Sequence, residues 1–242
     1  MSSLLSNARI EEVSLRDLER ICKEAEKFKM ELILIGGYAI RAYTKERSWR
    51  FTKDIDFITR KRDLTALHGV FDLLKYTFEK TEYGVKGSKK IDNESMQLHI
   101  SVDKVIDWST GLEYLLPEDI FKNAVKSSIK PYFEENVGME IGIKVAPVED
   151  VLIMKLMTER IRDHFDAITI IMDSFEKLDL KRFLKNSKHS NLDEHLRKRL
   201  NILLADIKKG TIKRLWKEFT GKEFLREQEV MLKDRIGKLL KI

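Results

Sequence analysis

The chain has 242 residues, of which 43% are hydrophobic and 36% charged, with only 11 Gly and 3 Pro. This length predicts one large domain or two small ones, and the composition excludes collagen-like, low-complexity and disordered proteins. Cys22 is the single cysteine, and no cluster of Cys and His has zinc-ligand spacing, which excludes disulfide scaffolds and zinc ribbons.

The sequence has no pattern typical of a membrane or secreted protein. The longest nearly apolar stretch, residues 32–40, has nine residues, whereas a membrane span is suggested by ~18. The first residues do not combine a basic start with a following apolar run, so we expect no signal peptide. These features predict a cytoplasmic protein with no membrane partner.

Charge is unevenly distributed along the chain. Residues 181–242 hold 18 Lys and Arg against 8 Asp and Glu, whereas residues 1–180 hold 28 against 32. Such asymmetry suggests a polyanionic partner, of which nucleic acid is the commonest. A solvated helix surface is the alternative, and the charge pattern alone favours neither.

Apolar spacing, glycines and prolines predict the elements of the first part of the chain. These are a helix over 14–29 with Ser14 as its N-cap, a strand over 31–35, a Gly-Gly turn, a helix over 38–44, a strand over 54–59, a helix over 63–74, a hairpin over 76–91 with Gly84 and Gly87 near its turn, and an alternating strand over 96–105. A short helix from Pro117 and strands over 128–133 and 140–145 follow.

The remainder of the chain has helical spacing throughout. Pro147 opens a helix to residue 159, followed by helices near 162–175, 179–186, 191–208, 211–218 and 222–241, with Gly210 and Gly221 as breaks. We therefore expect an α/β fold with two domains. Residues 1–146 form a mixed β-sheet flanked by helices, and residues 147–242 form a helical bundle with a basic C-terminal part.

Two aspartates in the second predicted strand are the main candidates for chemistry. On a strand, Asp54 and Asp56 project from one face, while Ile55 and Phe57 point into the core. Adjacent carboxylates repel each other, and a divalent cation is the usual compensation. Oxygen ligands of this kind suit Mg²⁺ or Mn²⁺ held by one or two carboxylates and substrate phosphates.

A Gly-Gly pair lies between the first strand and the following helix. Without side chains, Gly36 and Gly37 allow backbone N–H groups and a helix N-terminus to approach a phosphate closely. A plain tight turn is the alternative for the pair taken alone. Combined with Asp54 and Asp56, the pair favours a site for a nucleoside triphosphate.

These motifs, with two later ones, resemble the DNA polymerase β-like nucleotidyltransferase superfamily. Within it, the chain is most similar to the AbiEii-type abortive-infection branch, which includes toxins of toxin–antitoxin pairs. The resemblance covers roughly residues 33–166 and is carried by Gly36-Gly37-Tyr38-Ala39, by Arg50-x-Thr52-x-Asp54-Ile55-Asp56-Phe57, by the segment from Glu149 to Lys155, and by Arg160-x-Arg162-Asp163-x-x-Asp166.

The resemblance implies a nucleotidyltransferase-type fold and metal-dependent transfer of a nucleoside monophosphate from an NTP to an acceptor hydroxyl. Asp54 and Asp56 would then hold Mg²⁺ or Mn²⁺, and Gly36 and Gly37 would cradle the triphosphate. A third carboxylate normally completes such a site. Asp103 is our candidate, because the predicted strand places it on a polar face, and it could also accept the proton of the acceptor hydroxyl. Asp107 is the reserve candidate.

The resemblance also assigns residues to the nucleotide. It places Lys155 facing the phosphates, with a snorkelling surface lysine as the alternative. Arg50 and Thr52 precede the acidic pair closely enough to steer phosphate, although a loop salt bridge is the alternative for Arg50. The Arg-Asp-x-x-Asp segment could orient Lys155 or bind substrate, or its acids could interact with the helix dipole, and these alternatives stay open.

An aromatic and basic loop around Trp49 could stack a base of an RNA acceptor, although such a tryptophan is more often packed inside. For His99 a structural role is favoured. The basic tail makes tRNA or another structured RNA the expected acceptor, contacted through its phosphates. An aminoglycoside-like small-molecule acceptor and an inactive nucleotide- or RNA-binding module are the alternatives. A toxin role would imply an antitoxin protein as partner.

Overall fold

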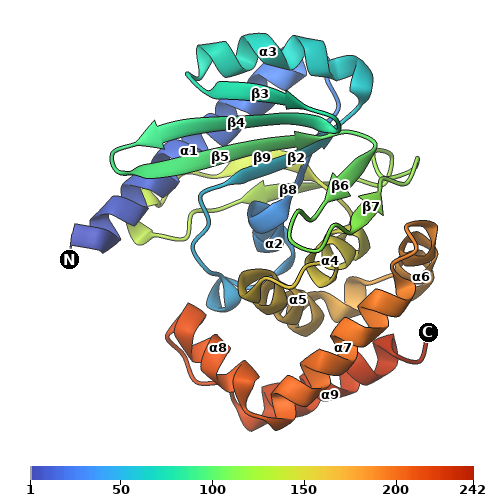
Figure 1. Cartoon of the computed structure of the whole chain (residues 1–242). Helices are drawn as coiled ribbons and strands as arrows, with labels where there is room; N and C mark the ends of the chain where they lie inside the picture. The colour runs from blue at the N-terminus through green and yellow to red at the C-terminus, as the bar shows by residue number, and fades with distance from the viewer. Residues whose placement is uncertain (1) are drawn as a thin grey trace. The chain divides into compact units, whose positions relative to one another are not determined.

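The computed structural model describes residues 2–242 and falls into two compact units (Figure 1). One, here called the sheet unit, comprises Met1–Ala42, Phe51–Lys104 and Glu118–Ala146. The other, the helical unit, comprises Tyr43–Arg50, Val105–Pro117 and Pro147–Ile242. The chain thus passes between the units several times, and the functional division at residues 146 and 147 stays a prediction.

The sheet unit is built on a seven-stranded mixed sheet, which confirms the predicted α/β class. The strand order is β3-β4-β5-β2-β1-β9-β8, in which β2 pairs with β5 and β1 with β9 in parallel, while the other pairs are antiparallel. Its elements are α1 (Ser2–Lys27), β1 (Leu32–Ile35), α2 (Gly36–Tyr43), β2 (Ile55–Thr59), α3 (Leu64–Leu73), β3 (Thr77–Thr81), β4 (Gly84–Ile91), β5 (Glu94–Ser101), β8 (Val125–Ile129) and β9 (Ile141–Val145).

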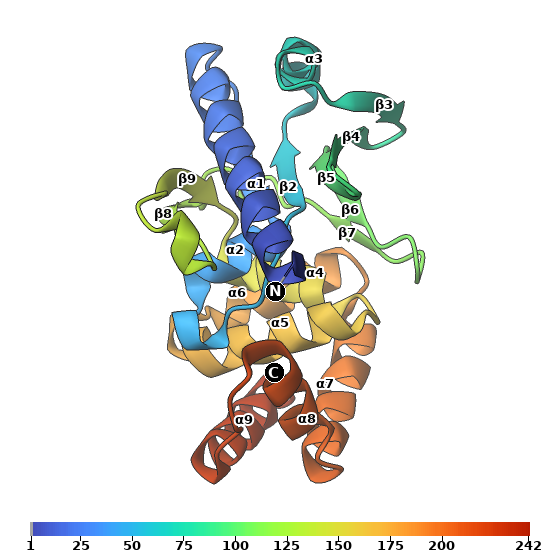
Figure 2. The same ribbon diagram turned by 90° about the vertical axis from the view of Figure 1, so that its left-hand side faces the viewer.

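Apolar periodicity explains how these elements pack. All four residues of β1 are buried, as expected for a strand that lies between two others inside the sheet. Helix α1 buries Leu15, Leu18 and Ile21, which lie at helical spacing and are at most 1% exposed. Figure 2 shows α1 running beside the sheet, and it contacts β9 and α3.

Several predicted details of the sheet unit are wrong. Ser14 is not an N-cap, because α1 begins at Ser2, and its buried hydroxyl donates to the carbonyl of Lys53 (2.7 Å) and accepts from Tyr38 (2.9 Å). Gly87 lies inside β4 rather than near the turn. Residues 118–123 form turns and not a helix. The strand predicted over 128–133 corresponds to β8, which ends at Ile129, four residues earlier than predicted.

The helical unit contains the predicted series of helices. They are α4 (Val148–Leu156), α5 (Ile161–Ser174), α6 (Leu180–His189), α7 (Asp193–Lys208), α8 (Thr211–Thr220) and α9 (Arg226–Leu239), with a two-stranded sheet of β6 (Lys104–Ile106) and β7 (Glu113–Leu115). Gly210 and Gly221 flank α8 with φ of 77° and 68°, so the predicted breaks are confirmed. Over residues 2–242, no helix is long and apolar enough to cross a membrane.

The net charge of the protein belongs entirely to the helical unit. This unit holds 25 Lys and Arg against 19 Asp and Glu, a net of +6, whereas the sheet unit holds 21 of each. The positive excess that the sequence shows near its C-terminus is therefore a property of one folded unit. The basic helical unit therefore attracts anionic ligands more strongly than the neutral sheet unit does.

Candidate active site

The two aspartates lie at the start of β2 and are each held by β5. Oδ1 of Asp54 accepts a hydrogen bond from the backbone N–H of Gln97 (2.9 Å), and Oδ1 of Asp56 lies 3.0 Å from Nδ1 of His99. Both contacts follow from the parallel register, which pairs Asp56 with His99. Burial raises the pKa of Asp54, an effect that the hydrogen bond from Gln97 opposes and the charge of Asp56 reinforces.

Gly36 and Gly37 are the first residues of α2 rather than a separate turn before it. Gly36 has φ of +71°, and a Cβ at this position would overlap Oδ2 of Asp56. A Cβ on Gly37 would lie 2.5 Å from Oγ1 of Thr52. The glycines therefore provide room for the Asp56 and Thr52 side chains, a requirement that does not depend on a bound phosphate.

Replacing Gly36 with alanine is expected to displace the Asp56 carboxylate and to reduce nucleotidyl transfer at least as much as a direct change of Asp56. The added methyl group meets both a strained φ and an occupied position. The change can be measured by initial rates of transfer and by thermal unfolding. The control is Gly237→Ala in α9, where a Cβ meets no atom within 4 Å. Wild-type rates in the Gly36 variant would contradict this prediction.

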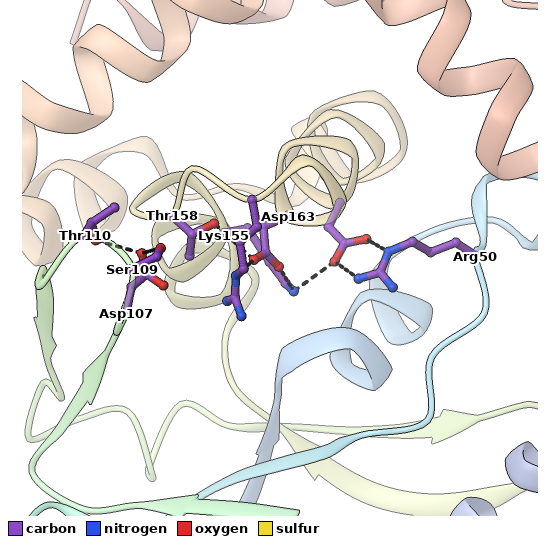
Figure 3. Close-up of polar contacts among 9 residues, drawn as sticks. Arg50, Asp107, Ser109, Thr110, Lys155, Thr158 and Asp163 are labelled. Carbon is purple, nitrogen blue, oxygen red and sulfur yellow. Dashed lines mark hydrogen bonds and ion pairs between the residues drawn. The ribbon is translucent and has the colours of Figure 1, made fainter. Parts of the chain in front are cut away.

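The strand that was expected to present the third carboxylate ends too early. We predicted a strand to residue 105 with Asp103 on its polar face, but β5 ends at Ser101 and Asp103 lies exposed in a turn with φ of 62°. The reserve candidate Asp107 is buried, and its carboxylate accepts hydrogen bonds from Ser109 (2.8 Å) and Thr110 (2.7 Å) (Figure 3). Neither residue has the strand position on which the prediction depended, and the role of third carboxylate stays a prediction without that support.

The donor groups around Asp54 suit a divalent cation that brings further ligands with it. Over the described residues, no group of three His, Cys, Asp or Glu side chains is arranged to hold a metal ion. Two neighbouring carboxylates are nevertheless the ligands that Mg²⁺ uses when substrate phosphates complete its coordination. Burial and the neighbouring charge of Asp56 both raise the pKa of Asp54, and a cation at this point would oppose both effects.

Lys155 lies in a buried network of ion pairs within the helical unit (Figure 3). Its ammonium group contacts a carboxylate oxygen of Asp163 and lies 2.8 Å from Oδ2 of Asp166. The Lys155 side chain is only 9% exposed, which excludes the alternative of a snorkelling surface lysine. Thr158 and Arg160 also contact Asp163, at 3.0 and 2.6 Å.

Arg50 belongs to the same network. Its Nε and a terminal nitrogen donate to the two oxygens of Asp166, at 2.8 and 2.7 Å, in the two-bond geometry typical of strong arginine–carboxylate pairs. Asp166 thus joins Arg50 to Lys155. Of the Arg-Asp-x-x-Asp segment, Asp163 and Asp166 contact Lys155, whereas Arg162 is exposed. These contacts are those expected of residues that orient Lys155, and a role in substrate binding stays a prediction.

Electrostatics keep this network charged at neutral pH. Burial would lower the pKa of Lys155, but the carboxylates of Asp166 and Asp163 outweigh it, so this pKa is raised. Burial would raise the pKa of Asp163, but Lys155 and Arg160 outweigh it and the pKa is lowered. Each charge therefore depends on its partners, as buried ion pairs generally do.

The structure also places two ring-bearing residues that the sequence analysis considered, Trp49 and His99. Trp49 is 8% exposed and its indole N–H donates to the carbonyl of Thr44 (3.2 Å), so the stacking role is wrong and packing is confirmed. His99, for which the sequence favoured a structural role, contacts the carboxylate of Asp56, and its role stays a prediction. Its alternation with Leu98 and Ile100 was visible in the sequence, but the pairing with Asp56 required the strand register.

The chain is similar to known proteins in sequence and in fold. The sequence model of the family described as "Nucleotidyl transferase AbiEii toxin, Type IV TA system" matches residues 16–233. No curated protein sequence matches the chain.

Several solved structures are similar to it at low sequence identity. The crystal structure of JHP933 from Helicobacter pylori has a TM-score of 0.54 and 16% identity over 93% of this chain and 90% of that one. The antibiotic-resistance factor ANT(2'')-Ia has a TM-score of 0.47 and 16% identity, over 75% and 95% of the two chains. The lincosamide antibiotic adenylyltransferase LnuA has a TM-score of 0.41 and 14% identity, over 64% and 94%. The first likeness shows the fold that the two chains share.

Proposed function

The chain belongs to the AbiEii family of nucleotidyltransferase toxins, and we propose that it transfers a nucleoside monophosphate from an NTP to a hydroxyl group of an RNA, with tRNA as the first candidate. Nucleotidyl transfer and the toxin role are properties of the family. The proposal adds the acceptor, the divalent metal and the residues that perform each task.

The charge distribution is the observation that supports an RNA acceptor. The helical unit has a net charge of +6 and the sheet unit has none. A folded unit with this excess attracts a polyanion through its phosphates, and structured RNA offers many phosphates in a fixed arrangement. Exposed basic residues that contribute include Lys181, Lys185, Lys188, Arg197, Lys208, Lys209, Lys213, Arg214 and Lys217.

We propose Asp54 and Asp56 as the residues that would hold Mg²⁺ or Mn²⁺. The bound cation would neutralise charge on the triphosphate and on the attacking oxygen. The protein's own contribution is then positioning, because phosphoryl transfer depends mainly on alignment and electrostatic stabilisation. The backbone N–H of Gln97 orients Asp54, and the bare Cα of Gly36 leaves space for Asp56.

The remaining predicted nucleotide ligands are retained as part of the proposal. Gly37 and Thr52 pack together, which supports a shared role in shaping the phosphate site. Arg50 lies four residues before Asp54 in the sequence and is held by its ion pair with Asp166. This ion pair therefore fixes the start of the segment that leads to the two carboxylates. For Lys155 to bind phosphate, phosphate oxygens would have to join its two carboxylate partners or replace one of them, because its ammonium group has three N–H donors.

The test is transfer of label to RNA. The purified protein is incubated with Mg²⁺, total RNA and each α-³²P-labelled NTP separately, beside an Asp54→Asn, Asp56→Asn double variant. Label is expected in tRNA-sized RNA with one preferred nucleotide, only with the wild-type protein, and only without EDTA. Raising the salt concentration should weaken transfer to RNA steeply, because phosphate contacts release counterions.

Other outcomes would contradict parts of the proposal or favour one of its alternatives. Label on a small molecule or on protein, with none on RNA, would contradict the RNA acceptor while leaving the enzyme assignment intact. Equal labelling of RNA by the double variant would contradict the roles of the two aspartates. Binding of Mg²⁺ and NTP without transfer to any acceptor would favour the binding-module alternative. The family's toxin role also supports an antitoxin protein as partner, and its addition should suppress the effect of the chain on cell growth.

A further inference from the structure

His99 is the polar side chain that β5 places next to the two aspartates. The parallel register brings it opposite Asp56, with Nδ1 3.0 Å from Oδ1. An ionised carboxylate only accepts hydrogen bonds, so Nδ1 is the atom that donates. The two side chains are 40% and 28% exposed, so this contact is at a partly open site and not in the core.

The two oxygens of Asp56 have different surroundings. Oδ2 lies against the bare Cα of Gly36, where even a methyl group would not fit, and Oδ1 receives the hydrogen bond from His99. An aspartate carboxylate otherwise rotates readily about its last torsion, which is broad and has no strong preference. Gly36 and His99 together therefore restrict Asp56 to one orientation.

The position of His99 also matters for charge. With Asp103 in an exposed turn beyond the end of β5, the neighbour of Asp56 on the adjacent strand is an imidazole rather than a carboxylate. The sheet unit then presents two negative charges at this point. Mg²⁺ held by only two carboxylates relies on substrate phosphates for its other ligands.

We infer that His99 is a positioning residue, which holds Asp56 in the orientation that receives a divalent cation together with the nucleotide. The inference rests on the proposed function. It assigns His99 no direct contact with the cation or the reacting atoms. Hydrogen bonds to a ligating side chain generally change metal affinity by about 10- to 100-fold, which sets the expected size of the effect.

The test compares His99→Leu, which removes the donor, with His99→Asn, whose amide nitrogen can replace Nδ1. Binding of Mn²⁺ is measured by electron paramagnetic resonance, with and without the α,β-methylene analogue of each ribonucleotide in turn. We expect wild-type protein to bind Mn²⁺ more tightly with an analogue than without. His99→Leu should weaken Mn²⁺ binding in the presence of the analogue by about tenfold, whereas His99→Asn should restore it to within about threefold.

Ser95→Ala is the matched control, because Ser95 is exposed on the same face of β5 and its hydroxyl accepts a hydrogen bond from the side chain of Gln97 (2.8 Å). Thermal unfolding of each variant shows whether the fold is intact. Wild-type affinity in a folded His99→Leu variant would overturn the inference, as would an equal loss in His99→Leu and His99→Asn. Failure of the wild-type protein to bind Mn²⁺ with any analogue would instead overturn the proposed function on which the inference rests.

Discussion

Asparagine in place of Asp56 is expected to reduce nucleotidyl transfer by roughly a thousandfold while the fold stays intact. In the proposed site Asp56 would be a charged metal ligand, whose loss removes several kcal/mol of transition-state stabilisation, and each 1.4 kcal/mol corresponds to about tenfold in rate. Asparagine has nearly the same shape, so the packing against Gly36 is preserved. Initial rates of label transfer to RNA measure the effect.

Asparagine in place of Asp54 should stabilise the folded protein. Burial raises the pKa of Asp54, so its ionised form opposes folding at pH values above that pKa and its neutral form does not. Asp54→Asn removes the charge permanently and should raise the melting temperature at pH 7. This gain should disappear as the pH falls through the raised pKa, because the wild-type carboxyl is then neutral as well.

Asp92→Asn provides the matched control for both aspartates. Asp92 is exposed in the turn between β4 and β5, with φ of 53°, a conformation that asparagine tolerates well. Its replacement should leave both transfer and the melting temperature unchanged. If Asp54→Asn and Asp56→Asn retained transfer at the rate of this control, the assignment of the site to β2 would be wrong.

Methionine in place of Lys155 should have the largest effect on stability, a loss of about 3–5 kcal/mol at pH 7. The side chain is of similar length and apolar, so it fills the space but leaves Asp163 and Asp166 buried with one cation fewer. Urea unfolding measures the change, provided that the unfolding free energy falls with urea concentration at the same slope in the variant and the wild type. Lys185→Met, at an exposed position of α6, is the control and should differ little from wild type.

The pH dependence of the stability lost in Lys155→Met distinguishes uncompensated buried charge from a loss of packing. In the wild type, the lowered pKa of Asp163 gives stability that is present above the usual aspartate range and lost as the pH falls through the lowered value. Without Lys155, less opposes the effect of burial, which raises the pKa of Asp163. The stability that the Lys155→Met variant loses relative to wild type should therefore become smaller as the pH falls, and a loss that is equal at every pH would point to packing alone.

Local pattern was sufficient for most elements of this protein. Apolar spacing predicted α4 to α9, and the glycines at 210 and 221 marked the ends of α8 because a left-handed backbone conformation costs glycine little. The Asp-x-Asp pair and the Gly-Gly pair could be placed on adjacent elements in the same way. Residue type and spacing over a few positions carry this information.

Contacts between distant residues were decided by the tertiary structure. His99 bonds Asp56 across 43 positions because β2 and β5 pair in parallel, and Arg50 bonds Asp166 across 116 positions. The end of β5 at Ser101, which moved Asp103 off the strand, likewise had no sequence marker. The sequence by itself thus determined most of the helices and strands, and it placed the two aspartates and the two glycines at the elements where the structure has them. Only the folded chain decided their partners, because strand register and helix packing depend on burial summed over the whole structure.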